Sequence, residues 1–233
     1  MPTALLVHGI TNGPSTMWRF AEWLEARGWE VEAKAQLGHG GRGPAPSYTL
    51  DALGRDNVAM GDHDLVIGHS LGGSTAVKAL SLRPGWTKRL VVIDPALYVG
   101  PDGNGMSVES QVAELALTAE DIQALHPAWD RRDVVAKAEE STRVDPEAVR
   151  AIMSREQEPW DLRAAISGFD IPVLLLTADP SVFSIVDPAD AAAIVAANPN
   201  VTWVSVDGAG HNVHRDAPER VREVLLDWLD RTA

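Results

Sequence analysis

The pentapeptide Gly68-His69-Ser70-Leu71-Gly72 contains the residue types and the spacing that most clearly suggest chemistry. It follows the apolar run 65–67 and precedes a helix-like stretch that ends near residue 82. Glycines two residues before and after a serine let neighbouring backbone pass closely, so the serine stands on a tight strand-to-helix turn. The turn also leaves the Leu71 N–H at a helix N-terminus, where a developing negative charge is stabilised. The motif predicts a serine nucleophile, and the alternative is a glycine-rich turn with an incidental serine.

Strand-like and helix-like segments alternate on both sides of this motif, which indicates what positions it. The expected strands are 3–7, 29–35, 65–68, 90–93, 172–177 and 201–206, and the expected helices are 15–27, 49–59, 70–82, 188–197 and 218–229. The alternating pattern of 29–35 is typical of a strand near the sheet edge. Strands that alternate with helices predict an α/β fold, in which a parallel sheet has helices on both faces. Reactive groups should gather at the carboxyl ends of its strands.

The rhythm changes between residues 95 and 168, where helical patterns occur without convincing strands. The expected helices are 108–125, 132–141 and 146–156, and residues 100–105 form a Gly- and Pro-rich hinge candidate. We therefore predict a core made of 1–94 and 169–233, with a helical cap of 95–168 inserted between two strands.

Composition limits the possible classes of function. The chain of 233 residues has no cysteine, which excludes disulfides and thiol catalysis, and its net charge of −13 argues against nucleic-acid binding. No apolar run approaches the ~20 residues of a membrane span, and no signal peptide is evident, so a cytoplasmic location is expected. Asp62-His63-Asp64 has the residue types of a metal site, but three consecutive residues rarely converge on one ion, so no metal is predicted.

Three further features follow other expected strands. His8-Gly9-Ile10 comes after the first strand, Asp94 and Asp179 follow two later ones, and Gly210-His211 follows the last. The order serine, acid, histidine is that of the α/β-hydrolases. With the helical insertion and the Gly38-His39-Gly40 loop, these motifs resemble that superfamily over nearly the whole chain. The resemblance is to small serine esterases and lactonases with a helical cap. It implies an α/β-hydrolase fold without a cofactor, here of about six strands because the usual first two antiparallel strands are missing.

The resemblance implies a role for each motif. Ser70 needs an adjacent base, and His211 is placed to take its proton. The N–H groups of Ile10 and Leu71 would form the oxyanion hole. A carboxylate must orient the imidazole, and here two alternatives stay open. Asp179, at the commonest position, is favoured over Asp94.

Asp187 is a third and more distant candidate for the acid. His214 is a rival to His211, although its neighbours suggest an exposed position.

Large side chains of the cap and of the loop after His8 suggest the substrate pocket. Trp18, His8, Trp129 and Trp160 are candidate substrate contacts, and packing between cap and core is the alternative for them. If two or more of them line the cleft, the substrate is apolar.

These features together predict a serine hydrolase that cleaves a small, apolar carboxylic ester or lactone through an acyl-enzyme on Ser70. Alternatives on the same triad are a C–C bond hydrolase and a cofactor-free peroxidase. A non-enzymatic ligand-binding or signalling member of the fold is the remaining alternative. The expected partner is a small molecule, with no nucleic acid and no membrane, and the expected state is a monomer or homodimer.

Overall fold

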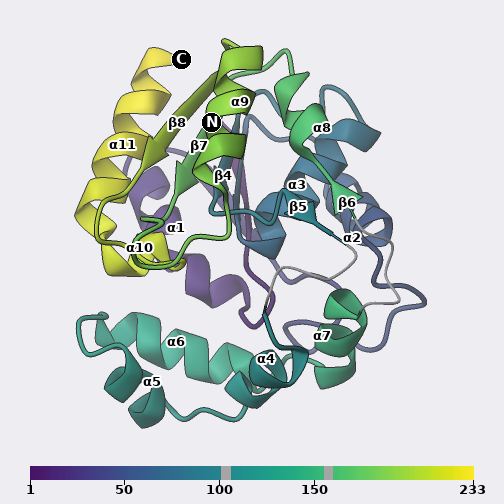
Figure 1. The fold of residues 1–233 in the computed structure, drawn as a ribbon, viewed down its shortest axis with the longest axis vertical. Helices are drawn as coiled ribbons and strands as arrows, with labels where there is room; N and C mark the ends of the chain where they lie inside the picture. Colours follow the sequence, from purple (N-terminus) through teal and green to yellow (C-terminus); the bar gives the residue numbers. More distant parts are fainter. Residues whose placement is uncertain (101–105, 155–159) are drawn as a thin grey trace.

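A parallel sheet forms the centre of the protein in the computed structural model, which describes residues 1–100, 106–154 and 160–233 (Figure 1). In this part of the chain the sheet has six strands in the spatial order β2-β1-β3-β4-β7-β8, all parallel. The strands are β1 (Thr3–Val7), β2 (Glu30–Lys34), β3 (Leu65–His69), β4 (Leu90–Ile93), β7 (Val173–Thr177) and β8 (Val201–Ser205). The predicted α/β-hydrolase fold with a six-stranded sheet is confirmed, and β2 lies at the edge, as its alternating sequence indicated.

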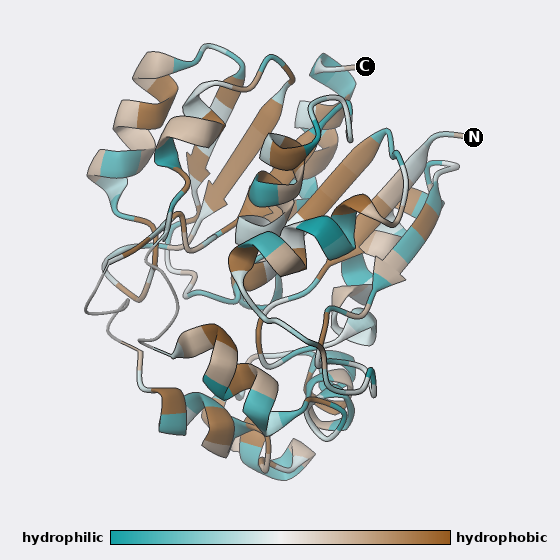
Figure 2. Cartoon of the chain, turned by 90° about the vertical axis from the view of Figure 1, so that its right-hand side faces the viewer, coloured by the Kyte–Doolittle hydropathy of each residue, from teal (hydrophilic) through white to brown (hydrophobic). Residues whose placement is uncertain are grey.

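Helices cover both faces of this sheet. The helices around it are η1 (Pro14–Met17), α1 (Trp18–Glu25), α2 (Leu50–Val58), α3 (Leu71–Leu82), α8 (Arg163–Ser167), α9 (Pro188–Ala197), α10 (Val213–Asp216) and α11 (Pro218–Arg231). Successive strand residues point to opposite faces, so each apolar strand contributes to two cores. Figure 2 shows these strands as the most hydrophobic segments of the chain.

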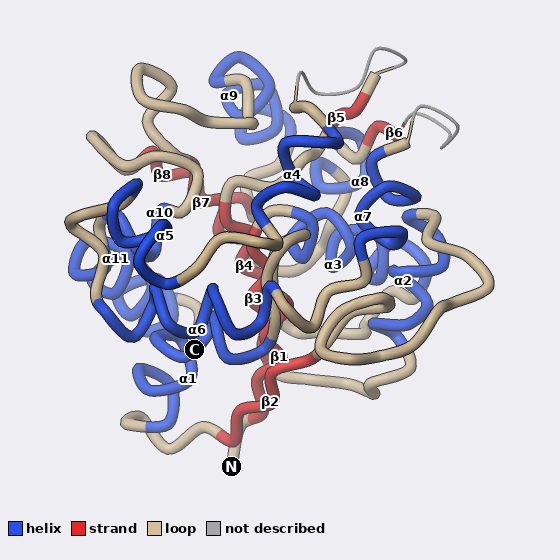
Figure 3. Tube along the Cα trace, turned by 90° about the horizontal axis from the view of Figure 1, so that it is seen from below, coloured by secondary structure: helices blue, strands red, loops and turns tan. Residues whose placement is uncertain are grey.

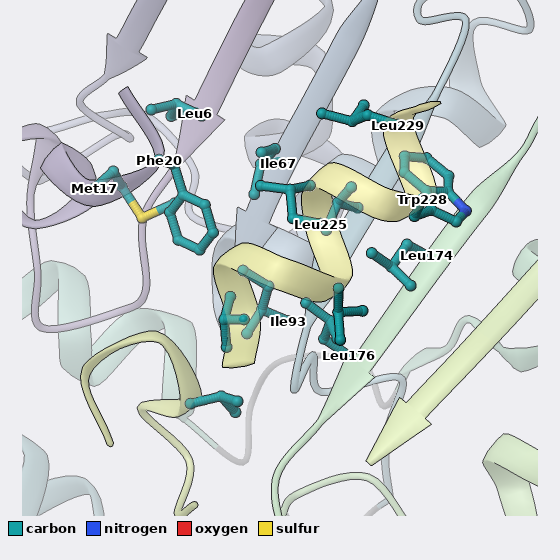
Figure 4. Close-up of a cluster of buried hydrophobic side chains, with 14 of the residues drawn as sticks. Leu6, Met17, Phe20, Ile67, Ile93, Leu174, Leu176, Leu225, Trp228 and Leu229 are labelled. Atoms are coloured by element: carbon teal, nitrogen blue, oxygen red, sulfur yellow. The ribbon is translucent and has the colours of Figure 1, made fainter. Parts of the chain in front are cut away.

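Each face has its own apolar cluster. On one face α1 and α11 pack on the strands, with Phe20, Leu174, Leu225 and Trp228 buried among them (Figure 4). On the other face α3, α8 and α9 pack on side chains such as Leu175. Burial of one such side chain stabilises the fold by about 1.5–3 kcal/mol. The two clusters hold the strand ends, and therefore the loops that follow them, in fixed positions.

Four further helices lie beyond the carboxyl ends of the strands, as Figures 1 and 3 show from two directions. They are α4 (Val108–Glu114), α5 (Ala119–Leu125), α6 (Arg131–Ser141) and α7 (Pro146–Met153), and we call them the cap helices. The short antiparallel strands β5 (Tyr98–Val99) and β6 (Trp160–Asp161) pair where the insertion begins and ends. Sequence reasoning missed this pair. The division into domains at residues 94 and 168 stays a prediction.

The expected helix 108–125 is divided into two in the structure. Thr118 caps the start of α5, and the Asp121 carboxylate in turn accepts from the Thr118 N–H, which is a capping box. The expected hinge at 100–105 lies, except for Gly100, outside the described residues. The end of the expected helix 146–156 also lies outside them.

Candidate active site

Ser70 lies between β3 and α3 in a strained backbone conformation. Its φ of 54° and ψ of −122° are rare for a residue with a side chain, and such strain costs about 1–3 kcal/mol. The flanking glycines are required by close backbone contacts. A Cβ on Gly68 would lie 2.4 Å from the Gly72 oxygen, and one on Gly72 would lie 2.1 Å from the Val7 oxygen. The turn thus has the geometry of a nucleophile elbow.

His211 joins Ser70 to a buried carboxylate. Its Nε2 is 2.9 Å from Ser70 Oγ, and its Nδ1 is 2.7 Å from Asp94 Oδ2. A neutral ring can satisfy both contacts only if Nδ1–H donates to the carboxylate and Nε2 accepts from the hydroxyl. This tautomer is the one that a general base requires.

Asp94 follows β4, the strand next to β3, and its side chain is completely buried. Besides His211, its carboxylate accepts hydrogen bonds from the N–H groups of Ala178 at 3.2 Å and Ile185 at 3.1 Å. The hydroxyl of Ser184 donates a further bond of 2.6 Å. These donors fix the carboxylate in one orientation and stabilise its charge without solvent.

The structure corrects the preference for Asp179 as the acid. Asp179 Oδ1 accepts from the N–H and hydroxyl of Ser181, and its Oδ2 accepts from the Gly208 N–H at 2.8 Å. The Gly208 bond is the main cause that lowers the pKa of Asp179 below its ordinary value. Asp179 ties together the loops that follow β7 and β8. Both Asp179 oxygens are thus engaged within these loops, and the carboxylate that contacts His211 is that of Asp94.

Asp187 and His214, the two other candidates for the acid and the base, have structural roles. Asp187 caps α9 by accepting from the Ala189 N–H. His214 is buried rather than exposed, and burial lowers its pKa well below the ordinary value. It packs against His69, whose Nε2 donates to the carbonyl oxygen of His211 and so supports the histidine loop.

The two predicted oxyanion donors border the serine. Leu71 is the first residue of α3, where N–H groups lack partners inside the helix. Ile10 lines the cavity beside Ser70, and His39 donates a hydrogen bond to its carbonyl oxygen. Burial lowers the pKa of His39, which favours the neutral ring.

A cavity of about 550 Å³ opens over Ser70 and His211. Apolar side chains at its wall include Ile10, Met106, Val182 and Phe183. The other described lining residues are mostly polar and come from both the core and the cap, among them Thr11, Asn12, Gln111, Glu114, His126, Lys137 and Asp216. The wall is therefore mixed, with apolar surface beside polar groups, and the expectation of an apolar substrate stays a prediction.

The three candidate tryptophans do not line this cavity. The Trp18 indole donates to Asp133 at 2.7 Å, and the Trp129 indole donates to Asp216 at 2.6 Å. Trp160 donates to a backbone oxygen and packs in the apolar cluster under α3. Each ring packs between elements of the fold. This agrees with the packing alternative and not with substrate contact.

His8 does not reach the cavity either. It is completely buried beneath the loop, where its Nδ1–H donates to the Gly9 oxygen and its Nε2 accepts from the Gln36 N–H. Burial lowers the pKa of His8 to about 3, so the ring is neutral near pH 7. His8 therefore supports the loop and does not contact the cavity.

Lys137 is the feature of the cavity that sequence reasoning missed. Its Nζ donates to the Thr11 oxygen at 2.6 Å, to Thr11 Oγ1 at 2.8 Å and to Ser141 Oγ at 3.1 Å. Glu114 lies 3.6 Å away, and burial lowers the pKa of Lys137 to about 8. On α6 the charged residues Asp133, Lys137 and Glu140 recur at helical spacing, a pattern typical of a solvated face, so the sequence offered no signal for this burial.

Neither a metal-binding cluster nor a membrane-spanning helix occurs in the part of the chain that the structure describes. Within residues 1–100, 106–154 and 160–233, no cluster of three or more side chains is suited to bind a metal ion. In those same ranges, no helix is long and apolar enough to cross a membrane.

The chain is similar to known hydrolases over nearly its whole length. N-formylmaleamate deformylase of Pseudomonas putida is 26% identical over 97% of this chain and 88% of its own length. 2-(Acetamidomethylene)succinate hydrolase of Mesorhizobium japonicum is 25% identical over 98% of this chain and 88% of its own length. A crystal structure of an E-2-(acetamidomethylene)succinate hydrolase superposes with a TM-score of 0.82 at 22% identity, over 98% of this chain and 91% of that one.

The model of the alpha/beta hydrolase family matches residues 4–224, which include the serine, the aspartate and the histidine described above. The chain belongs to the alpha/beta hydrolase family.

Proposed function

We propose that this protein is a serine hydrolase that cleaves an amide-type bond in a small polar acyl compound. The observation that carries the proposal is the chain of contacts from Ser70 Oγ through His211 to Asp94, at 2.9 and 2.7 Å, beside a cavity whose wall includes polar groups. Residues that act as nucleophile, base and orienting acid in other folds meet in this geometry.

The proposed reaction has two halves. Ser70 Oγ attacks the acyl carbon while its proton passes to His211 Nε2, and Asp94 stabilises the imidazolium. The N–H groups of Ile10 and Leu71 hold the oxyanion. His211 then gives the proton to the leaving nitrogen, which departs and leaves the acyl group on Ser70. Water, deprotonated by His211, attacks this acyl-enzyme and releases the acid and the free serine.

The substrate class is argued from the relatives and from the cavity. The relatives are named for a formyl group on nitrogen and for an acetamido group, each in a small carboxylate compound. Neither name describes an ester. The polar wall formed by Gln111, Glu114 and Lys137 is suited to a substrate with hydrogen-bonding groups.

Hydrolysis of a C–C bond is the second candidate. The same serine, histidine and oxyanion donors would serve it, and the two relatives that match nearly the whole chain are not named as esterases. Ester or lactone cleavage stays a hypothesis that the same experiment tests, because the machinery is the same. The cytoplasmic location and the monomeric or homodimeric state also stay predictions.

The test combines an active-site probe with a substrate panel. A fluorophosphonate should label Ser70 in the purified protein, as located by mass spectrometry. Small N-formyl and N-acetyl enamides that carry a carboxylate should be hydrolysed faster than 4-nitrophenyl acetate or a vinylogous diketone. Faster cleavage of the ester or of the diketone would replace the amide-type reading. A folded protein with no adduct and no turnover would contradict the hydrolase proposal and favour a ligand-binding role.

A further inference from the structure

Arg215 is a buried cation that the proposed reaction does not use. It lies on α10, four residues after His211, and its exposure is only 2%. Its Nη2 donates to Asn12 Oδ1 at 2.6 Å, and its guanidinium lies over the Trp129 ring, 4.9 Å from the centroid. Burial lowers the pKa of Arg215 to about 10, which leaves it charged near pH 7.

The setting of Arg215 is unusual for a buried charge. Buried cations are normally paired with a carboxylate, because an unpaired charge loses hydration without compensation. Among the described residues no carboxylate lies within ion-pair distance of Arg215, and its Nε and Nη1 have no hydrogen-bond partner there. Its one hydrogen bond goes to a neutral amide, and that amide lines the cavity.

This contact decides which end of the Asn12 amide faces the substrate. A guanidinium only donates hydrogen bonds, so the amide atom that it contacts must be the oxygen. The Nδ2 group must then point away from Arg215. It lies 3.4 Å from the position that a Cβ on Gly9 would occupy, and the Ser70 Cβ lies 3.3 Å from the same position. The Asn12 amide nitrogen and the Ser70 side chain therefore both lie beside Gly9, at the cavity that Asn12 and Ser70 line.

We propose that Asn12 Nδ2 donates a hydrogen bond to the acyl oxygen of the substrate, as a third donor beside the N–H groups of Ile10 and Leu71. Asn12 is then a catalytic residue, because it touches the reacting group. Arg215 is a positioning residue that holds the amide oxygen and never contacts the substrate. The positive charge behind the amide also polarises it and strengthens its N–H donors. This inference rests on the proposed function and deepens it.

The first test removes the donor in two ways. Asn12→Ala should lower kcat about 10²-fold with little change in KM, the scale on which loss of one oxyanion-hole donor acts. Asn12→Asp keeps an acceptor for Arg215 and adds an ion pair, so its thermal midpoint should equal or exceed that of the unmodified protein. Its kcat should nevertheless fall, because a carboxylate cannot donate. The readouts are kcat and KM on 4-nitrophenyl acetate and thermal unfolding by circular dichroism.

The second test asks whether Arg215 acts through Asn12. Arg215→Met should lower kcat when Asn12 is present and should not lower it further in an Asn12→Ala background. A merely structural role of Arg215 would lower kcat equally in both backgrounds, which would overturn the positioning role. If Arg215→Met does not fold, the Asn12→Asp variant still decides the main point, because a stable Asn12→Asp protein with unchanged kcat overturns the proposal.

Asn198→Asp is a matched control. Asn198 is also buried, and its amide donates to the Ile166 and Phe169 oxygens, away from the cavity. Its replacement should lower the thermal midpoint while kcat stays unchanged below that temperature.

The experiments distinguish a wrong proposed function from a wrong role of Asn12. An unmodified protein that fluorophosphonate does not label at Ser70 contradicts the hydrolase reading, and the role of Asn12 with it. A labelled and active protein whose Asn12 variants keep full kcat contradicts only the third donor.

Discussion

On the sheet side of the cavity, Ser70, Asp94 and His211 stand on loops that follow strands buried in apolar cores. On the cap side, α6 meets the core through buried charged side chains. Asp133 accepts from the Arg19 guanidinium at 2.6 Å, and Lys137 donates to the backbone oxygen of the loop after β1. One side is positioned by non-directional apolar packing, and the other by directional polar contacts.

The cap side also reaches into the catalytic machinery. Lys137 holds both the carbonyl and the hydroxyl of Thr11, the residue after Ile10, and Glu140 accepts from the Ser15 N–H. The loop that would supply one oxyanion donor is thus clamped from the cap. The difference teaches that the sheet sets the proposed nucleophile, base and acid, whereas the cap helices hold the loop proposed to supply an oxyanion donor and line part of the cavity.

The largest expected effect comes from the sheet side. Ser70→Ala should lower kcat by about 10⁶-fold, because the attacking oxygen is lost while the cap contacts are unchanged. The measurement is kcat on any substrate that the unmodified protein turns over, with circular dichroism to show that the fold is intact. Retention of most of the activity would remove Ser70 from the reaction.

The next effect separates the two aspartates. Asp94→Asn should lower kcat by about 10⁴-fold, because an amide cannot stabilise the imidazolium or keep its tautomer. Asp179→Asn is the matched control on the neighbouring loop and should lose far less activity. Equal small losses in both variants would show that neither carboxylate orients His211.

A third prediction concerns the cap interface. Asp133→Ala leaves the Arg19 guanidinium without its buried partner and should lower the free energy of unfolding by about 3–5 kcal/mol. Arg19→Met combined with Asp133→Leu should recover most of that loss, because two apolar side chains need no pairing. Chemical denaturation measures both variants. A negligible cost for Asp133→Ala would show that buried charge does not hold the cap side, and the comparison of the two sides would fail.

The last predictions are two pH windows, one for each side, in which the free energy of unfolding changes gradually with pH. His8 lies beneath the sheet side. Its pKa in the folded protein is about 3, below the ordinary 6.5. At pH values between 3 and 6.5, therefore, only the unfolded chain binds the proton. Its contribution to stability is complete above pH 6.5 and is lost as the pH falls towards 3, by about 1.4 kcal/mol per pH unit.

Lys137 on the cap side has a folded pKa of about 8 against an ordinary 10.5, so the unfolded chain again binds the extra proton between these values. Stability should therefore rise with pH from about 8 to 10.5, at the same slope for one proton.

The measurement for both windows is the free energy of unfolding against pH, in the unmodified protein and in His8→Gln and Lys137→Met. Each variant should lose only its own group's share of the slope, because burial also lowers the pKa of His39 and His214, which contribute to the slope below pH 6.5. An unchanged slope would show that the replaced group does not titrate there.

Much of the fold could be predicted because its signals are local. Apolar runs of strand length alternate with helical patterns, and this rhythm indicated the six strands and the faces that helices cover. The helix 108–125 was predicted as one element, because its apolar pattern continues past the capping box at Thr118. The β5–β6 pair was missed because two-residue strands have no period to detect.

The site was predictable only in part. Ser70 and His211 were named from motifs, and the structure brings them together. Trp18, Trp129 and Trp160 were named because large aromatic rings often line pockets, but each indole donates a hydrogen bond within the protein and none of the three rings lines the cavity. Lys137 was missed because a helix with charged residues at this spacing normally faces solvent.

The sequence by itself determined the elbow, because Gly-x-Ser-x-Gly is a local pattern and the close approach at Gly68 is to Gly72 and Gly73 of the same turn. Only the tertiary structure decided between Asp94 and Asp179. Both follow buried strands, and the difference is that the Asp94 carboxylate contacts His211, whereas the Asp179 carboxylate accepts from Ser181 and Gly208.

The tertiary structure likewise decided that Lys137 and Arg215 are buried at the cavity. Burial of a charge depends on what packs against it from distant segments, here Thr11 and Asn12 on the loop after β1. No pattern within a single helix contains that information.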